Sequence, residues 1–538
     1  MQEYEPLPAY LNVGRAADIK NKKERYIYRA MEIIPGVAIW STFVITVALA
    51  YFQPVLVSVL VLSFSMYWML RVYYFTLHGK AAYTRMRKHE KVDWVEKLNE
   101  LKPEEVTADV HHWGQVWHLV ILPMYNESFD LARETIEGIL RTDWPKERML
   151  LVLATEERAG EEAQEVARQV RAKYGDRFAR MLVTVHPDGL AGELSGKGSN
   201  AAWAGKRAKE ELIDTLNIPY EHVLVSSLDI DTIVFPRYFS CLTYHFLTSE
   251  NPYRASYQPI PLFINNIWHA PLLSRLSAFS SSFWEVMNQE RPEKKLTFSS
   301  HSMPFKTLVE VGFWNKNAVS EDSRIFWLCF LRFNGDYRVV SLYYPVAMDA
   351  NLAPTFWGTM KNVYRQQRRW GYGAADIPYF VYGYFKNGNI SARKMWQYGF
   401  TVAEGFYSWG THAILLFVMG WLPIFLGGDQ FNSTVLSYSL PRMTQFIMTF
   451  AMIGLVATAY YSIVVLPPRP AGFGRWRYGL FMAQWVFTPF NLIVFGALPA
   501  IDAQTRLMFG KYLGFWVTPK HRAEESPLTK ASKKHPAS

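Results

Sequence analysis

Long uncharged apolar runs stand near both ends of the chain and frame a charged middle. Residues 36–52 carry no charged side chain, and residues 54–74 carry none until Arg71. Runs of this length approach what a helix needs to cross a bilayer core of about 30 Å. The pattern predicts two transmembrane helices within residues 35–76, with a buried hairpin of a soluble protein as the alternative.

Two further apolar runs, residues 402–426 and 442–466, predict a second pair of transmembrane helices. The residues between them, 427–441, contain no lysine or arginine, whereas three arginines follow the second run within PPRPAGFGRWR. Because positive charge accumulates on the cytoplasmic side of a membrane, we expect residues 427–441 to lie outside.

A third apolar run, over residues 478–501, does not fit a simple crossing. Pro489 and Pro499 interrupt it, and a crossing would put the basic C-terminal tail outside. We therefore predict an interfacial or re-entrant helix within residues 476–511. The tail over residues 521–538 is polar and is expected to be disordered.

The flanks of the first two runs indicate the orientation of the chain. Residues 1–34 are polar and show no signal-peptide pattern. The basic residues on the two flanks are Arg15, Lys20, Lys22, Lys23, Arg25, Arg29, Lys80, Arg85, Arg87 and Lys88. They predict an integral protein of the inner or plasma membrane, with the N-terminus, the middle domain and the C-terminus in the cytoplasm.

The charged middle, residues 80–395, alternates between strand-like and helix-like segments. Strands are expected at 118–126, 149–157, 181–186 and 222–228, and helices at 129–141, 158–173 and 199–213. This alternation predicts an α/β domain with a mostly parallel sheet and flanking helices, inserted between the transmembrane segments. In such sheets, ligands bind at the carboxyl ends of the strands.

The composition of the chain indicates which classes of binding partner to expect. The net charge of +10 and the aromatic content of 16% suit an anionic sugar nucleotide and a membrane surface. No nucleic-acid-binding motif stands in the sequence, so nucleic acid is not an expected partner. The two cysteines, Cys241 and Cys329, give neither a disulfide framework nor a zinc spacing, which indicates a reducing compartment.

One strand ends in a pair of carboxylates. The segment HVLVSSLDID, residues 222–231, begins as a buried strand and ends with Asp229 and Asp231. This spacing lets both carboxylates approach one hard divalent cation, Mg²⁺ or Mn²⁺. A solvated turn after a strand is the alternative, because a single D-x-D is common by chance.

Three later segments add candidate chemistry. VSED, residues 319–322, offers either the acidic first turn of a helix or a general base. QQRRW, residues 366–370, offers amide, guanidinium and indole groups that suit a diphosphate and a sugar ring, or a basic face on a membrane. FWVTPK, residues 515–520, is by itself only a loop with a lysine.

The motifs PMYNE, DID, VSED, QQRRW and FWVTPK occur in the order found in processive family 2 glycosyltransferases, and the chain resembles the bacterial cellulose synthase catalytic subunit and hyaluronan synthases. FWVTPK looks like the F-x-V-T-x-K gating loop of the cellulose synthases. The resemblance extends over residues 118–520 and implies a GT-A-like catalytic domain, with an interfacial helix at about residues 356–385 and a gating loop at 512–520.

The resemblance also implies roles for particular residues. The implied donor-binding residues are Tyr125, Glu127, Glu156, Lys197, Asp229, Gln366, Arg369, Thr518 and Lys520. Asp229 and Asp231 would hold the metal, Asp322 would be the catalytic base, and Trp370 and Glu321 would contact the acceptor. Phe515, Val517, Thr518 and Lys520 would form the gating loop. The sequence departs from the family in having TEE in place of the usual acidic pair near Glu156, and SED in place of TED.

The predicted function is that of a membrane-embedded, inverting glycosyltransferase, which uses a nucleotide sugar, expected to be a UDP-sugar, and Mg²⁺ or Mn²⁺ to elongate a polysaccharide processively. Its partners would be the donor, a growing glycan or lipid acceptor, and membrane lipid, with a second copy of the chain or an export partner left open. The alternatives are a non-processive enzyme that adds one sugar to a polyprenyl phosphate or another lipid, a transporter, and a nucleotide-sugar sensor.

Overall fold

The computed structural model describes residues 6–519 and 521–522, and these contain one mixed sheet of eight strands in the order β3-β2-β1-β4-β7-β6-β8-β5. The strands are β1 (Trp117–Pro123), β2 (Met149–Glu156), β3 (Arg180–His186), β4 (Val223–Ser227), β5 (Ile233–Val234), β6 (Ala255–Phe263), β7 (Ser302–Pro304) and β8 (Arg338–Met348). The pairs β3–β2, β2–β1, β1–β4 and β6–β8 are parallel, and the other three are antiparallel. The predicted α/β class with a mostly parallel sheet is confirmed.

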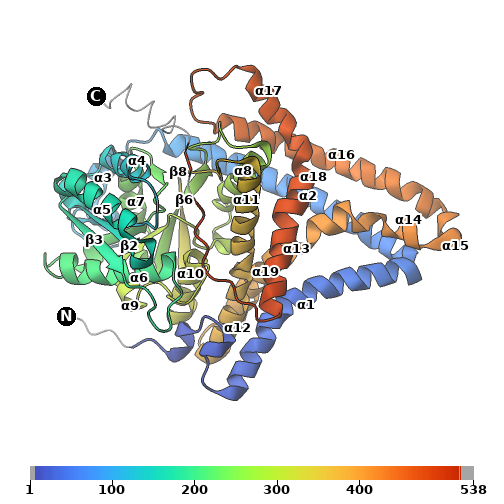
Figure 1. Ribbon diagram of the computed structural model, residues 1–538, viewed down its shortest axis with the longest axis horizontal. Helices are drawn as coiled ribbons and strands as arrows, with labels where there is room; N and C mark the ends of the chain where they lie inside the picture. Colours follow the sequence, from blue (N-terminus) through green and yellow to red (C-terminus); the bar gives the residue numbers. More distant parts are fainter. Residues whose placement is uncertain (1–5, 520, 523–538) are drawn as a thin grey trace.

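Helices cover both faces of the sheet (Figure 1). They are α3 (Trp94–Glu100), α4 (Phe129–Leu140), α5 (Glu161–Tyr174), α6 (Lys197–Ala208), α7 (Tyr238–Thr248), α8 (Leu272–Asn288), α9 (Phe305–Glu310), α10 (Glu321–Arg332), α11 (Phe356–Gly371) and α12 (Asp376–Asn387). Apolar residues of α4, α5 and α7 form a core on one face, and those of α6, α9 and α10 form a core on the other. Burial of both faces explains why β1, β2 and β4 are continuous apolar runs.

The four parallel strands at one side of the sheet bring the predicted motifs to one edge. In their register, Pro123 lies opposite Ala154, Glu156 opposite His186, and Ile121 opposite Ser227. The chain leaves this edge directly into the first motif, the second motif and the D-x-D. The strand and helix order predicted for residues 118–227 therefore places these side chains as expected.

Long apolar helices project from the sheet domain. The apolar part of the chain contains α1 (Lys22–Phe52), α2 (Pro54–His89), α13 (Ala392–Phe417), α14 (Leu422–Leu426), α15 (Gly428–Asn432), α16 (Val435–Val464), α17 (Trp476–Ala483), α18 (Thr488–Leu492) and α19 (Leu498–Met508). Among the described residues, four helical segments are long and apolar enough to cross a membrane, and these begin at Lys22, Pro54, Val435 and Trp476.

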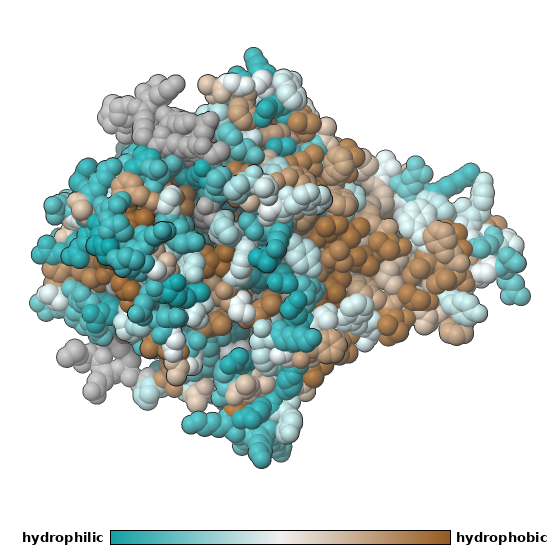
Figure 2. Space-filling view, viewed as in Figure 1, coloured by the Kyte–Doolittle hydropathy of each residue, from teal (hydrophilic) through white to brown (hydrophobic). Residues whose placement is uncertain are grey.

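The surface of the projecting helices is apolar. Figure 2 shows hydrophobic residues gathered over this part of the molecule, with hydrophilic surface over the sheet domain and at the far tip. Large apolar side chains there face outward, and Phe425 is 77% and Val435 81% exposed. An apolar belt between two polar ends is what a bilayer accommodates, so the chain has the character of a membrane protein.

One predicted apolar helix differs from the observed one. The helix expected over 402–426 is not continuous, because Ala392–Phe417 and Met419–Leu426 meet at a bend of 45°. Pro423 lies in the first turn of α14, where a proline fits the start of a helix but not its interior. The predicted pair of straight helices is thus one bent segment and α16.

The segment from Trp476 to Met508 is helical but irregular. Pro489 and Pro499 stand in the first turns of α18 and α19, and a π-helical turn separates the two helices. Figure 1 shows α18 and α19 running along the base of the projecting helices, where α19 contacts α1 and α11. Its length and apolarity also suit a crossing, so its placement at the interface stays a prediction.

Four strands of the domain were not anticipated by sequence, namely β5, β6, β7 and β8. Two of them, β6 and β8, contain Pro259, Pro261 and Pro345, which count against a strand. The predicted disordered tail begins too early, because Arg522 is buried and paired in the sheet domain. Residues 523–538 lie outside the described part of the chain.

Candidate active site

The two D-x-D carboxylates sit just beyond the end of β4 and have different surroundings. Asp229 is partly exposed, and its carboxylate accepts hydrogen bonds from Ser299 Oγ at 2.6 Å and from Lys197 Nζ at 2.7 Å. Asp231 is fully buried, and its Oδ2 accepts from the backbone N–H of Asp349 at 3.1 Å. The pair thus has one carboxylate facing the site and one embedded in the wall beneath it.

Lys197 joins the D-x-D to the VSED motif. Its ammonium group lies 2.7 Å from Asp229, 2.9 Å from Asp322 and 3.7 Å from Glu321. Burial alone would lower the pKa of Lys197, but the three carboxylates outweigh burial and raise this pKa above its ordinary value. The structure therefore brings a predicted metal ligand, the predicted base and the predicted acceptor-contacting Glu321 around the ammonium group of Lys197.

The VSED motif is both a helix start and part of the site. Glu321 and Asp322 form the first turn of α10, as the capping interpretation predicts, but the Ser320 side chain makes no capping bond. Their carboxylates point instead toward Lys197. Within the described residues, neither oxygen of Glu321 has a hydrogen-bond partner, and burial, reinforced by Asp322, raises the pKa of Glu321 to about 8.

This raised pKa makes stability depend on pH. Between the ordinary value of 4.5 and about 8, the folded chain keeps a proton on Glu321 that the unfolded chain releases. The free energy of unfolding of the wild type should therefore fall relative to Glu321→Gln as pH rises through this window, by up to about 1.4 kcal/mol per pH unit. Chemical unfolding of both proteins between pH 4.5 and pH 8 would measure it, and parallel curves would contradict it.

The QQRRW motif lies on α11 and presents its groups to the same region. Trp370 packs between Phe263 and Phe298, with ring centroids 6.0 Å and 5.7 Å away. Gln366 Oε1 accepts a hydrogen bond from Asn351 at 2.7 Å. Trp370, Gln366 and Asn351 line a small cavity that Asp349 also borders. This places the predicted acceptor side of the site next to the D-x-D.

The loop that carries FWVTPK packs against Gly196, the residue before Lys197. Gly196 has φ +154°, and a Cβ atom there would lie 2.4 Å from the Phe515 ring, so only glycine allows this close approach. On its other side, Phe515 lies under Arg369, whose guanidinium is 4.9 Å from the ring centre. Thr518 is buried, Val517 is partly buried, and Lys520 lies outside the described residues.

The remaining predicted donor-binding residues meet at the ends of β1 and β2. Glu127 Oε2 accepts from the backbone N–H of Tyr125 at 2.7 Å. Arg158, which the sequence analysis did not single out, donates to Glu156 at 2.6 Å and lies 4.7 Å from the centre of the Tyr125 ring. Arg158 thereby compensates the charge of Glu156 in the TEE motif, where the family has a different acidic pair.

Sequence analysis missed Asp349 as well. It directly follows β8, and its backbone holds Asp231 while its side chain accepts from Asn265 at 3.0 Å. An acidic residue immediately after an apolar run was the available signal, the same one that singled out Asp229. Asp349 was not predicted because Pro345 counts against a strand at this position.

One group of possible metal ligands lies elsewhere, at the α2–α7 contact. Ligand atoms of His89, Cys241 and His245 lie within 4.8 Å of one another. The spacing of Cys241 and His245 on one helix face was not anticipated. Both histidine rings pack against Trp94, and burial lowers the pKa of His245 to about 3. We assign this group to packing.

The comparison with protein families agrees with the motifs. Residues 224–464 match the model of the family described as Glycosyl transferase family group 2. The match contains the D-x-D, VSED and QQRRW motifs, whereas PMYNE, Lys197 and FWVTPK lie outside it. This part of the chain is thus similar to a glycosyltransferase family 2 domain, and the predicted enzyme class, a glycosyltransferase, is confirmed. The cellulose or hyaluronan synthase type stays a prediction, and no curated protein matches the chain.

Solved glycosyltransferases show partial structural similarity. The mannosyltransferase PcManGT from Pyrobaculum calidifontis, solved with GDP-Man and Mn²⁺, is 12% identical over 75% of this chain and 99% of its own, with a TM-score of 0.41. TarS from S. aureus is 12% identical over 63% of this chain and 54% of its own, with a TM-score of 0.27. Its residues 1–349 with UDP-GlcNAc give 12% identity, coverage of 66% and 93%, and a TM-score of 0.27.

Proposed function

We propose that the chain is a membrane-embedded, inverting glycosyltransferase that transfers sugar units from a nucleotide sugar, expected to be a UDP-sugar, to a growing polysaccharide. The observation that carries this proposal is the convergence of Asp229, Asp322 and Glu321 on Lys197, with Phe515 packed on the adjacent Gly196. A donor diphosphate, a base and an acceptor platform would thus share one site.

The donor end needs a divalent cation, and the residues present fit one. The D-x-D offers carboxylate oxygens, which are the ligands that Mg²⁺ and Mn²⁺ prefer. Asp229 and Asp231 would hold the ion, which when bound offsets the charge that develops on the departing nucleoside diphosphate. Lys197 and Arg369 add fixed positive charge beside this position and favour a phosphate group there.

The acceptor end needs a base, and we assign this role to Asp322. The ammonium of Lys197 lies 2.9 Å from this carboxylate. Asp322 takes the proton from an acceptor hydroxyl, which attacks the anomeric carbon on the face opposite the leaving diphosphate. The configuration at that carbon is inverted, and a base of this kind contributes a factor of about 10²–10⁴ to the rate.

Trp370 would support the acceptor sugar. Its ring is fixed by Phe263 and Phe298, and a fixed aromatic face holds a sugar ring with little loss of freedom. Phe515 lies against Gly196, the residue before Lys197, and the loop that carries Phe515 would exclude water, which limits hydrolysis of the donor. A product that stays on Trp370 and advances by one unit toward the apolar helices would make the enzyme processive.

The membrane arrangement follows from the apolar helices and their basic flanks. We infer a cytoplasmic sheet domain and C-terminus, with the far tip of the projecting helices outside. An ion pair between Arg71 of α2 and Glu404 of α13 lies among the rings of Trp68 and Phe75. Paired charges in such helices are expected to face one another rather than lipid.

The size of the product tests the proposal against its nearest alternative. The purified full chain would be incubated in detergent with single UDP-sugars and Mn²⁺, and the products separated by length. We expect long glycans early in the reaction, together with unextended acceptor. A single sugar on a lipid would favour the non-processive enzyme, and Trp370→Ala should shorten the glycans without abolishing donor binding.

A further inference from the structure

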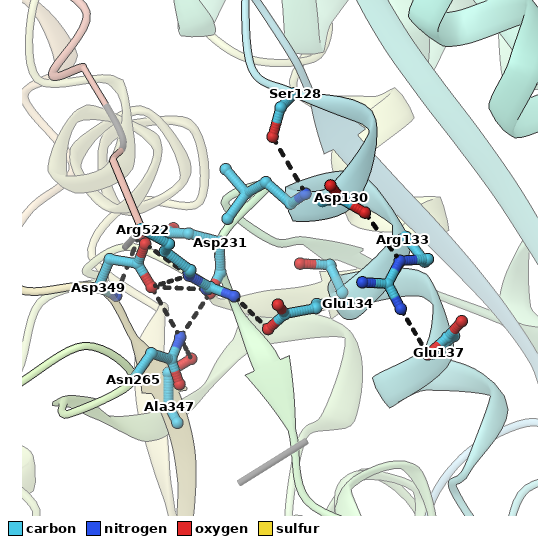
Figure 3. Close-up of polar contacts among 12 residues, drawn as sticks. Ser128, Asp130, Arg133, Glu134, Glu137, Asp231, Asn265, Ala347, Asp349 and Arg522 are labelled. Atoms are coloured by element: carbon cyan, nitrogen blue, oxygen red, sulfur yellow. Dashed lines mark hydrogen bonds and ion pairs between the residues drawn. The ribbon is translucent and has the colours of Figure 1, made fainter. Parts of the chain in front are cut away.

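Arg522 lies two residues beyond the FWVTPK motif and enters the wall of the active site. Its guanidinium donates to both oxygens of Asp349 at 2.6–3.0 Å and to Glu134 Oε2 at 2.5 Å. It also donates to the backbone carbonyl of Asp231 at 3.3 Å. Figure 3 shows the side chain reaching between Asp349 and Glu134, beside Asp231. One residue thus joins the C-terminal segment to α4, to the end of β8 and to the D-x-D.

These contacts are almost completely shielded from water. The side chain of Arg522 is 8% exposed, and those of Asp349 and Glu134 are 1% and 4% exposed. The guanidinium has a fixed charge and a planar fork that matches a carboxylate. Loss of the guanidinium would leave two carboxylates in a buried position, which is strongly unfavourable. The position of Arg522 is therefore well determined.

The same contacts reach the predicted metal ligand. The backbone N–H of Asp349 donates to Asp231 Oδ2 at 3.1 Å, and Asn265 Nδ2 donates both to Asp349 Oδ1 and to the Asp231 carbonyl. Arg522 donates to both carboxylate oxygens of Asp349 and to the same carbonyl of Asp231. Asp231 is thus held by a network that is complete only when Arg522 is in place.

The loop that precedes Arg522 is held by side chains along its length, including Arg369 against Phe515 and Arg365 against Trp516. Residues 511–519 form neither helix nor strand, so side chains must hold them over the site. Tyr512 donates to Glu32 Oε2 at 2.7 Å at one end, and Phe515 rests against Gly196 in the middle. Arg522 supplies the ion pairs at the far end.

We propose that Arg522 is a positioning residue of the donor site, which holds the 511–519 loop against Gly196, the residue before Lys197, and fixes Asp231 through Asp349. With Arg522 paired, the loop covers the donor and excludes water. When Arg522 separates from Asp349 and Glu134, the loop lifts and the nucleotide exchanges. The inference rests on the proposed function for the identity of the ligand. The tie, by which we mean the contacts of Arg522 with Asp349 and Glu134 that hold the loop, can be tested without enzyme turnover.

Amide hydrogen exchange of residues 511–519 tests the tie directly in the full chain in detergent. Arg522→Ala should speed exchange in this loop by about tenfold or more, because the loop opens more often. Arg522→Lys keeps the positive charge but loses the planar fork of the guanidinium. The exchange rate of residues 511–519 in this variant should therefore lie between the rates of the wild type and Arg522→Ala. Arg338→Ala, which removes an exposed ion pair with Glu250, is the matched control and should leave exchange unchanged. Equal exchange in wild type and Arg522→Ala would overturn the proposal.

A second variant removes the excess buried charge, in case Arg522→Ala does not fold. Arg522→Met with Glu134→Gln eliminates the guanidinium and one of its two carboxylate partners. The exchange of residues 511–519 should again rise by about tenfold. Unchanged exchange in this folded double variant would equally overturn the proposal.

The ratio of donor hydrolysis to sugar transfer distinguishes a positioning role of Arg522 from a purely structural one. In Arg522→Ala the ratio of donor hydrolysis to sugar transfer should rise by about tenfold, because water enters the site. A purely structural role would lower both activities by the same factor, and an unchanged ratio would contradict the positioning role. If the wild type turned over no nucleotide sugar while Arg522→Ala still loosened the loop, the proposed function would fail and the tie would stand.

Discussion

Replacement of Asp322 by asparagine is expected to lower the rate of sugar transfer by about 10²–10⁴-fold, which is the usual contribution of a general base. Asparagine keeps the shape of the side chain and still accepts a hydrogen bond from Lys197, which lies 2.9 Å from the carboxylate. It cannot take a proton from the acceptor hydroxyl. The rate of nucleoside diphosphate release in the presence of acceptor and Mn²⁺ would measure the loss.

Donor binding separates this effect from damage to the site. Asp322→Asn should bind nucleoside diphosphate with Mn²⁺ about as tightly as the wild type, because Asp229 and Asp231 are unchanged. Asp336→Asn, an exposed change on the same domain, should have no effect on either measurement. Equal transfer rates in wild type and Asp322→Asn would show that another group is the base.

Replacement of Lys197 by methionine should damage both stability and activity. The ammonium is the common partner of Asp229, Asp322 and Glu321, and its loss leaves the charges of Asp229 and Asp322 to repel one another. Removal of one member of a buried charged group typically costs 3–5 kcal/mol. Since Asp229 and Asp322 remain 25% and 21% exposed, we expect about 3 kcal/mol here.

Thermal unfolding and donor turnover would measure these two losses. The destabilisation of the variant should also depend on pH in a definite direction, because carboxylates without the Lys197 ammonium take up protons more readily. The variant should therefore be least destabilised at low pH. Lys209→Met, which removes a more isolated ion pair with Asp214, is the matched control with an expected loss of about 1 kcal/mol or less. Similar losses in the two variants would contradict the central position given to Lys197.

The first half of the domain could be predicted from sequence because its local and global signals agree. Strands β1, β2 and β4 are apolar runs buried on both faces, and the helices between them begin at recognisable residues. Ser128, for example, caps α4 by accepting from the Leu131 N–H. The second half could not be predicted in this way. The prolines of β6 and β8 are tolerated within the sheet by a register shift near Gln258, which no local pattern reveals.

The candidate site was predicted as a set of residues but not as a structure. Asp229, Asp322 and Lys197 were singled out separately, and no pattern in the sequence indicates that the Lys197 ammonium joins the two carboxylates. Arg522 was assigned to a disordered tail because its neighbours are polar. Its role depends on Asp349 and Glu134, which lie 173 and 388 residues away along the chain. Long-range charge pairing of this kind has no local signature.

The central claim is that Asp229 and Asp322 belong to one metal-dependent site for sugar transfer. Its most direct test is nucleoside diphosphate release by the purified full chain, with a panel of UDP-sugars and GDP-mannose, with and without Mn²⁺. We predict that at least one UDP-sugar gives release that requires Mn²⁺, matches the sugar incorporated into glycan, and is lost in both Asp229→Asn and Asp322→Asn. Release at the level of these two variants with every donor would contradict the account.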